Sequence, residues 1–207
     1  MKSKMNLFAM GIVVLVGMAI AAQSSCTSEA EAKITPEKKE LSKSELIARG
    51  QYLTTVSLCN DCHSPKVFGP HGMGLDSTKL FSGHPAGSPL PAFDKSALKP
   101  GSWILFSGDL TASVGPWGMS FAANLTPDST TGIGAWSEET FIKTLRTGKH
   151  LGQEGGRPIM PPMPWEMVRN MTDEDLKAIY TYLQALPPVK NQVPAPIAPD
   201  EAAKMKM

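Results

Sequence analysis

The sequence is poor in cysteine, in excess charge and in long apolar stretches. Its 207 residues contain three cysteines, and the formal net charge is +1 without a basic run, which argues against nucleic-acid binding. The longest apolar run, residues 7–22, is shorter than the about 20 residues that a membrane-spanning helix needs. A hydrophobic fraction of 42% is enough for a core, and the length suits one domain with flanking segments.

Residues 1–25 are typical of an export signal, because two lysines precede the apolar run and small residues follow it. Residues 19–21 (AIA) form one candidate cleavage site. The other is Cys26, whose surroundings resemble a bacterial lipoprotein signal in which the cysteine becomes the lipidated first residue. We favour lipidation, because Cys26 would otherwise be an unpaired exported thiol, and therefore expect a lipid-anchored protein on the periplasmic side of a bacterial membrane. Residues 26–43 have almost no large apolar side chains, which predicts a flexible tether.

One stretch carries the chemistry. Cys59, Cys62 and His63 form the pattern Cys-x-x-Cys-His, which is typical of covalent attachment of a c-type haem. Two thiols within one helical turn can reach the two vinyl groups of a single porphyrin. The adjacent imidazole of His63 can then coordinate the iron from the proximal side.

Other sites also use Cys-x-x-Cys, namely thioredoxin-like redox pairs, zinc sites and short disulfides. No βαβ pattern follows here, and a disulfide across so short a loop would stabilise little. The remaining histidines (His71, His84 and His150) are scattered, so they do not complete a zinc site, and for His71 and His84 we expect surface or hydrogen-bonded roles. The histidine directly after the second cysteine favours a single, covalently attached haem c.

Hydrophobic periodicity and capping residues predict three main helices. The first begins at Ser44 and contains Gly50, which indicates that another element approaches closely. The second begins at Ser137 and ends at Gly148, and the third begins after Thr172. Between the haem motif and the second helix the chain lacks sustained periodicity, which predicts a long loop-rich insertion with at most one hairpin. Residues 191–207 are expected to be a loose tail.

The iron has a second axial position, for which the sequence offers a thioether. Residues 157–165 (RPIMPPMPW) cannot form a helix or a central strand, because they contain four prolines. This stiff segment holds Met160 and Met163, and a methionine sulfur is a soft neutral donor that raises the reduction potential relative to a second histidine. Spacing alone leaves the two methionines tied.

Four further motifs accompany Cys-x-x-Cys-His: RGQYL at 49–53, NLTPD…TGIGAW at 124–136, MPW at 163–165 and TDEDL at 172–176. Together they resemble class I cytochrome c domains, most closely the monohaem domains of membrane-associated bacterial cytochromes c, including cytochrome subunits of periplasmic sugar and alcohol dehydrogenases. Those subunits often carry three haem motifs, whereas this chain has one. The resemblance implies iron ligation by His63 and Met163, because Met163 precedes the Pro-aromatic pair.

The resemblance also implies an all-α, class I cytochrome c fold over residues 44–190, with the first helix packed across the last near Gly50. The implied function is that of an electron carrier rather than an enzyme, moving single electrons between a periplasmic or membrane dehydrogenase and a respiratory acceptor. The alternative is a haem enzyme or ligand sensor with a labile methionine, for which His150 and Arg157 are the candidate distal residues. A third class is a structural lipoprotein without haem.

Overall fold

The computed structural model describes residues 40–70 and 72–206. The helices are α1 (Lys43–Val56), α2 (Cys59–His63), α3 (Glu138–Thr147), α4 (Trp165–Val168), α5 (Asp173–Gln184) and α6 (Pro199–Lys204), with 3-10 turns η1 (Lys95–Leu98) and η2 (His150–Gly152). The strands are β1 (Lys66–Gly69), β2 (Gly72–Leu75), β3 (Leu105–Phe106), β4 (Ala112–Gly115) and β5 (Gly118–Phe121). The predicted signal peptide (1–25), Cys26, most of the predicted tether (26–43) and His71 lie outside the described residues. Within them, none of the helices has the length and hydrophobicity to cross a membrane.

Helix α1 begins slightly earlier than the sequence predicted, because Ser42 rather than Ser44 is its N-cap. The backbone N–H of Glu45 donates to Ser42 Oγ at 3.3 Å, and the backbone N–H of Ser42 donates to Glu45 Oε2 at 2.8 Å. This reciprocal capping box gives partners to backbone N–H groups that the start of a helix leaves without intrahelical acceptors.

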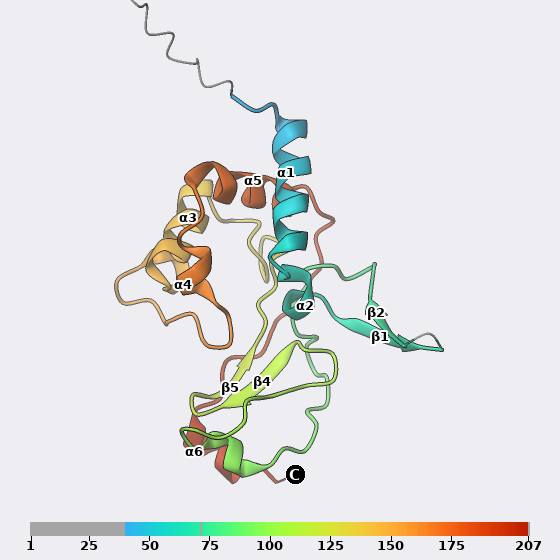
Figure 1. The fold of residues 1–207 in the computed structure, drawn as a ribbon, viewed down its shortest axis with the longest axis vertical. Coiled ribbons are helices and arrows are strands. Elements are labelled where there is room, and N and C mark those ends of the chain that lie inside the picture. The colour runs from blue at the N-terminus through green and yellow to red at the C-terminus, as the bar shows by residue number, and fades with distance from the viewer. Residues whose placement is uncertain (1–39, 71, 207) are drawn as a thin grey trace, which may run out of the picture. The chain divides into compact units, whose positions relative to one another are not determined.

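Helix α1 packs across α5, and Gly50 lies at the crossing (Figure 1). A Cβ atom at position 50 would lie 2.6 Å from Tyr182 Cβ and closer still to the carbonyl oxygen of Ala178. Such distances are below 3.0 Å, the limit that real Cβ contacts respect, so only glycine allows the two backbones to approach this closely. The predicted role of Gly50 is therefore confirmed.

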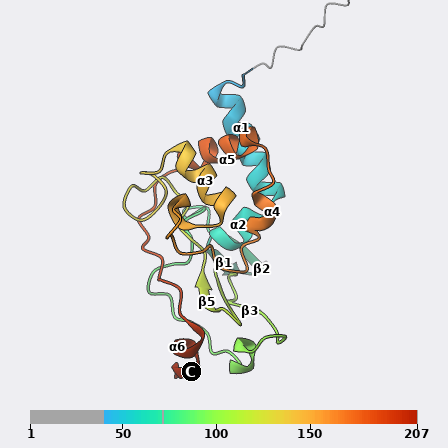
Figure 2. The ribbon, with the colours of Figure 1, turned by 90° about the vertical axis from the view of Figure 1, so that its left-hand side faces the viewer.

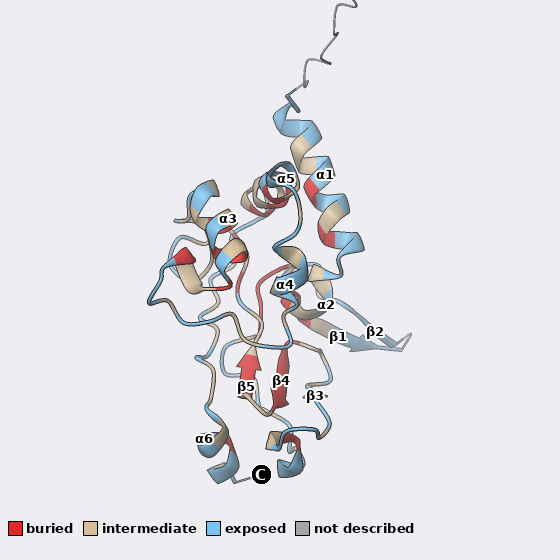
Figure 3. Ribbon diagram, turned by 60° about the vertical axis from the view of Figure 1, so that its left-hand side comes forward, coloured by how far each residue is buried: buried red, intermediate tan, exposed pale blue. Residues whose placement is uncertain are grey.

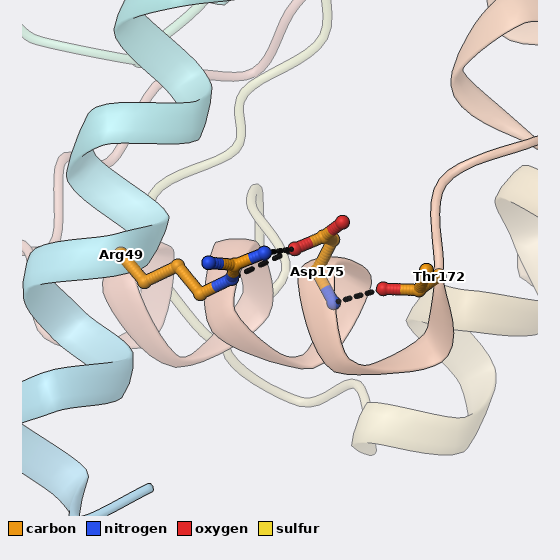
Figure 4. A network of polar contacts seen from close by, with 3 residues as sticks. All are labelled: Arg49, Thr172 and Asp175. Carbon is orange, nitrogen blue, oxygen red and sulfur yellow. Dashed lines mark hydrogen bonds and ion pairs between the residues drawn. The ribbon is translucent and has the colours of Figure 1, made fainter.

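An ion pair joins the same two helices next to the crossing. Arg49 Nε donates to Asp175 Oδ1 at 2.8 Å, and Arg49 Nη2 donates to the same oxygen (Figure 4). The backbone N–H of Asp175 donates in turn to Oγ1 of Thr172, the predicted N-cap of α5, at 3.1 Å. Because the Arg49 side chain is 47% exposed, solvent screening limits the pair to about 0.2–1 kcal/mol. The ion pair therefore contributes more to the alignment of α5 along α1 than to the free energy of unfolding.

Helix α3 lies beside α5 (Figure 2). As predicted, Ser137 caps it by accepting the backbone N–H of Thr140 at 3.1 Å, and Gly148 ends it with a φ of 67°. The hydrophobic core forms mainly between these two helices and two loop residues. Its buried members are Phe81, Ile133, Phe141, Leu145, Leu176, Ile179 and Leu183.

The predicted all-α fold is wrong, because the described chain also contains two small antiparallel sheets, β1–β2 and β3–β4–β5. The fold is mixed α/β. All five strands lie between residues 66 and 121, in the segment expected to be a loop-rich insertion. Strands of two to four residues are too short to show the alternation that identifies a strand, and β4 shows none because it is buried along its whole length. Their glycines and serines also lack the branched side chains that favour strands.

The two sheets differ in burial (Figure 3). Strand β4 is buried throughout, and β5 is buried except at its last residue. The hairpin β1–β2, by contrast, is exposed along most of its length, and the Phe68 side chain is 70% exposed. Strands β4 and β5 are therefore part of the folded interior, whereas the edge strand β3 is partly exposed and the hairpin that follows the haem motif lies at the surface.

The C-terminal segment, which we expected to be loose, packs against the domain. It runs from α5 past β5 to α6 (Figure 1). Ile197 forms an antiparallel bridge with Met119 through two backbone hydrogen bonds of 2.8 and 2.9 Å. Lys95 Nζ donates to the carbonyl oxygen of Ala203 at 2.7 Å, and Ala202 of α6 is fully buried. The C-terminal segment makes most of these contacts through its backbone. Such contacts place no demand on side chains, so this proline- and alanine-rich sequence has no hydrophobic periodicity that would predict them.

Candidate haem site

Helix α2 carries the whole Cys-x-x-Cys-His motif. The chain passes from α1 into α2 at Leu58, whose φ of 58° lies in the left-handed region. Non-glycine residues adopt this conformation at a cost of about 1–3 kcal/mol and do so most often at functional sites. Cys59 and Cys62 are three positions apart on the helix, so they share one face. Both are free thiols and both are half-buried.

The two thiols are held protonated. Burial raises the pKa of Cys59 to about 11. Burial also raises the pKa of Cys62, an effect that nearby Lys66 partly opposes. Thiolates, not thiols, attack disulfides and bind zinc, so these raised pKa values argue against a reactive dithiol. In the described part of the chain, no three His, Cys, Asp or Glu side chains are grouped as a metal ion would require. Neutral thiols suit thioether formation, in which S–H adds across a vinyl double bond.

His63 has one ring nitrogen occupied and one available. Its Nδ1 lies 2.8 Å from the carbonyl oxygen of Ala123, and because a carbonyl can only accept, Nδ1 carries the proton. Burial lowers the pKa of His63, so the ring is neutral and Nε2 presents a lone pair. No described residue hydrogen-bonds to Nε2. In the described chain, every fully buried side-chain nitrogen and oxygen has a hydrogen-bond partner. Nε2 is therefore not fully buried, and it remains available to coordinate iron.

Met163 lies between η2 and α4, and its side chain is half-buried against the hydrophobic core. Its carbonyl oxygen accepts the backbone N–H of Trp165 at 2.9 Å. The Trp165 ring covers Gly148, where a Cβ atom would lie 2.5 Å from ring carbon Cζ2. The Pro-aromatic pair after Met163 thus fixes this loop to the end of α3. Met160 is partly buried as well, but among the described side chains it is not one of those that pack against the core.

The core itself is incompletely covered by protein. Seven buried residues form it, and thirteen further apolar side chains pack against it while remaining partly exposed. Cys59 and Met163 both belong to this partly exposed group, so the first cysteine of the haem motif and the candidate sixth ligand border the same core. A large apolar group placed against these side chains would remove their remaining surface from water, at about 25 cal/mol per Å². The residues present therefore fit a haem.

The other histidines have different surroundings. His84 is 3% exposed, and its Nδ1 lies 2.7 Å from Thr111 Oγ1. The His150 ring lies edge-on to Trp136, with 5.6 Å between centroids, and its backbone N–H donates to the carbonyl oxygen of Arg157 at 2.9 Å. The hydrogen-bonded role expected for His84 agrees with this geometry, while His71 lies outside the described residues.

Sequence reasoning missed the group that orients His63. The acceptor is the backbone carbonyl of Ala123, 60 residues away along the chain, and an alanine side chain gives no signal for such a role. The nearest sequence signal is the next residue, Asn124, which begins the NLTPD motif. Asn124 is 4% exposed and makes several hydrogen bonds.

No protein-family model matches the chain. Over 80 residues it is 39% identical to a nicotinate dehydrogenase component of Pseudomonas putida, covering 39% of this chain and 6% of that protein. It is 28% identical over 158 residues to the fructose dehydrogenase cytochrome subunit of Gluconobacter japonicus, covering 73% of this chain and 25% of the relative. It is 30% identical over 137 residues to the gluconate 2-dehydrogenase cytochrome c subunit of Pantoea cypripedii, covering 66% of this chain and 22% of that relative.

The chain thus spans a quarter or less of the length of these curated relatives. Its homologues include cytochrome c subunits of dehydrogenases, at modest identity over most of this chain. The resemblance to such subunits that the sequence motifs predicted is confirmed.

Proposed function

We propose that this protein is a one-electron carrier with a single haem c, attached through Cys59 and Cys62 and ligated by His63 and Met163. The observation that carries the proposal is His63, whose neutral ring has Nδ1 occupied by Ala123 and Nε2 available. The two protonated thiols lie on the same short helix as His63. The Met163 thioether and Cys59 both pack against the hydrophobic core while remaining partly exposed. Homology to cytochrome c subunits supports an electron-transfer role.

The residues around the site would shape the chemistry in two ways. When bound, a haem supplies a reversible one-electron change at its iron. Met163 is a neutral donor that favours the ferrous state, and the surrounding apolar side chains exclude water and disfavour the extra charge of the ferric state. His63 keeps its proton at Nδ1, where it donates a hydrogen bond to the carbonyl oxygen of Ala123. A ligand held in this way takes up no further proton when the iron is reduced. Met163 thus favours a high potential, and the fixed proton on His63 favours fast, proton-independent transfer.

The redox partners we propose are a dehydrogenase as donor and a respiratory acceptor. The proposal rests on the relatives, which are named as subunits of fructose and gluconate 2-dehydrogenases. From the sequence we further propose export to the periplasmic side of a bacterial membrane and anchoring through a lipid on Cys26.

The test begins with the exported protein, purified from a host able to mature c-type cytochromes. A haem stain of a denaturing gel should be positive, and His63→Ala should abolish the mature holoprotein. A colourless preparation, or normal amounts of correctly ligated His63→Ala protein, would refute haem attachment.

The sixth ligand is tested by Met163→Ala with Met160→Ala as the matched control. Met163→Ala should retain covalent haem but open the sixth position, so that the reduced protein binds carbon monoxide. Met160→Ala and the unaltered protein should not bind it. An unchanged low-spin spectrum in Met163→Ala would exclude this ligand. Carbon monoxide binding by the unaltered protein would instead favour a ligand sensor or haem enzyme.

A further inference from the structure

The C-terminal segment is bound to the chain beside His63 through one side chain, Asn191. Its amide group Nδ2 donates to the carbonyl oxygens of Ser82 at 2.7 Å and His84 at 2.9 Å. Its Oδ1 accepts the backbone N–H of Ala86 at 2.8 Å. These bonds join positions 105 to 109 residues apart along the chain. Asn191 therefore fixes the backbone of residues 82–86.

Gly83 lies between the two carbonyl groups that Asn191 binds. Its backbone N–H donates to the carbonyl oxygen of His63 at 2.8 Å, and its φ is 77°. A Cβ atom at this position would lie 2.7 Å from the carbonyl oxygen of Ala123 and closer still to that of Ala122. The segment that Asn191 fixes thus lies close against the backbone of Ala122 and Ala123, and the backbone N–H of His84 donates to the carbonyl oxygen of Ala122 at 2.9 Å.

A second contact from the same C-terminal segment holds the residue that follows Ala123. Asn124, the next residue after Ala123, donates from Nδ2 to the carbonyl oxygens of Val189 at 2.8 Å and Asn191 at 3.3 Å. Its Oδ1 accepts the backbone N–H of Thr126 at 3.0 Å. Because Asn124 is almost fully buried, its side chain has little freedom to move. Residues 189–191 therefore support Ala123 in two ways, through Asn124 next to it in the sequence and through the segment 82–86 packed against it.

We infer that Asn191 is a positioning residue, which sets how strongly His63 donates to iron by holding residues 82–86 against the Ala123 carbonyl. The inference rests on the proposed function, since it takes His63 as the proximal ligand. A carbonyl bound to the Nδ1–H of a ligating histidine makes the ring a stronger base and fixes its orientation. Loss of Asn191 leaves the carbonyls of Ser82 and His84 without their donor, so the support of Ala123 relaxes and the Nδ1–H···O bond weakens.

The experiment compares Asn191→Ala and Asn191→Asp with Lys95→Ala in purified holoprotein. Asn191→Asp keeps the size of the side chain and the acceptor for Ala86 but loses both donated bonds, so it separates the effect of these bonds from that of the lost side-chain volume. Lys95→Ala is the control, because it removes another anchor of the C-terminal segment at Ala203, away from residues 82–86. The first readout is the reduction potential. The second is the iron–histidine stretching frequency, measured on reduced protein in the Met163→Ala background.

Both Asn191 variants should show a lower iron–histidine frequency, and the uncharged Asn191→Ala variant should also show a higher potential, while Lys95→Ala matches the parent protein. We expect up to about a tenfold loss of preference for ferric iron, which corresponds to about 59 mV for one electron. An unchanged frequency in both Asn191 variants overturns the inference, even if the potential shifts, because the effect then does not pass through His63. A preparation without haem would instead overturn the proposed function, so the two failures are distinguishable.

Discussion

The close crossing of α1 and α5 makes Gly50→Ala the most direct test of how this domain is held together. The substitution would favour α1 by about 1 kcal/mol through helix propensity. The new Cβ would, however, lie 2.6 Å from Tyr182 Cβ and closer to the Ala178 carbonyl, which is backbone and cannot rotate away. Ordinary contact begins at 3.4 Å, so the helices must separate. Overpacking of this kind costs typically about 1–3 kcal/mol, and contact with backbone places it at the upper end.

The expected net effect is a loss of about 2 kcal/mol in the free energy of unfolding, or about 4–8 °C in Tm for a domain of this size. It is measured by urea and thermal unfolding of the holoprotein, followed by far-ultraviolet circular dichroism. Gly155→Ala is the matched control, because a Cβ there meets no atom within 4 Å, and its stability should stay within about 0.5 kcal/mol of the parent. A Gly50→Ala protein as stable as the parent would refute the close approach.

Two further predictions concern a surface turn and the membrane anchor. Hydrogen bonds from Thr131 and Thr130 lower the pKa of Asp128 from 3.8 to about 2, so the stability they provide is complete above about pH 4 and is lost as the pH falls through 2. Asp128→Asn should therefore flatten the fall in stability between pH 4 and 2 in urea titrations, and an unchanged slope would contradict this. Cys26→Ser should move the exported protein from the membrane fraction to the soluble periplasmic fraction, whereas continued membrane association would exclude a lipid on Cys26.

The helices and the haem motif could be predicted because the residues that determine them are close together in the sequence. Ser137 and Thr172 cap their helices through backbone groups only three positions away. Gly148 ends α3 in a left-handed conformation that glycine adopts without strain. The motif Cys59–His63 likewise occupies a single helical turn. Even the crossing at Gly50 was predictable, since a glycine inside a helix implies a neighbour that a side chain would exclude.

The sheets and the C-terminal segment could not be predicted, because long-range backbone bonds determine them. Strand β5 pairs with β4 on one side and meets Ile197, more than 75 positions later, on the other. Backbone hydrogen bonding of this kind places few demands on side chains. The four-residue strands, with glycine or serine at several positions, therefore look like loop in the sequence.

The surroundings of His63 show where the remaining sequence signal lies. The functional group there is a backbone carbonyl, and every residue type could supply it, so residue identity at position 123 predicts nothing. The constraint falls instead on the neighbours that make room for this carbonyl and hold it: a glycine with positive φ at 83, a buried amide at 124 and a partly buried amide at 191. In a segment without periodicity, glycines and asparagines are typical of turns. When such residues are buried in the fold, as Asn124 is, they instead indicate the support of a backbone group that orients another side chain, here the Ala123 carbonyl that binds His63.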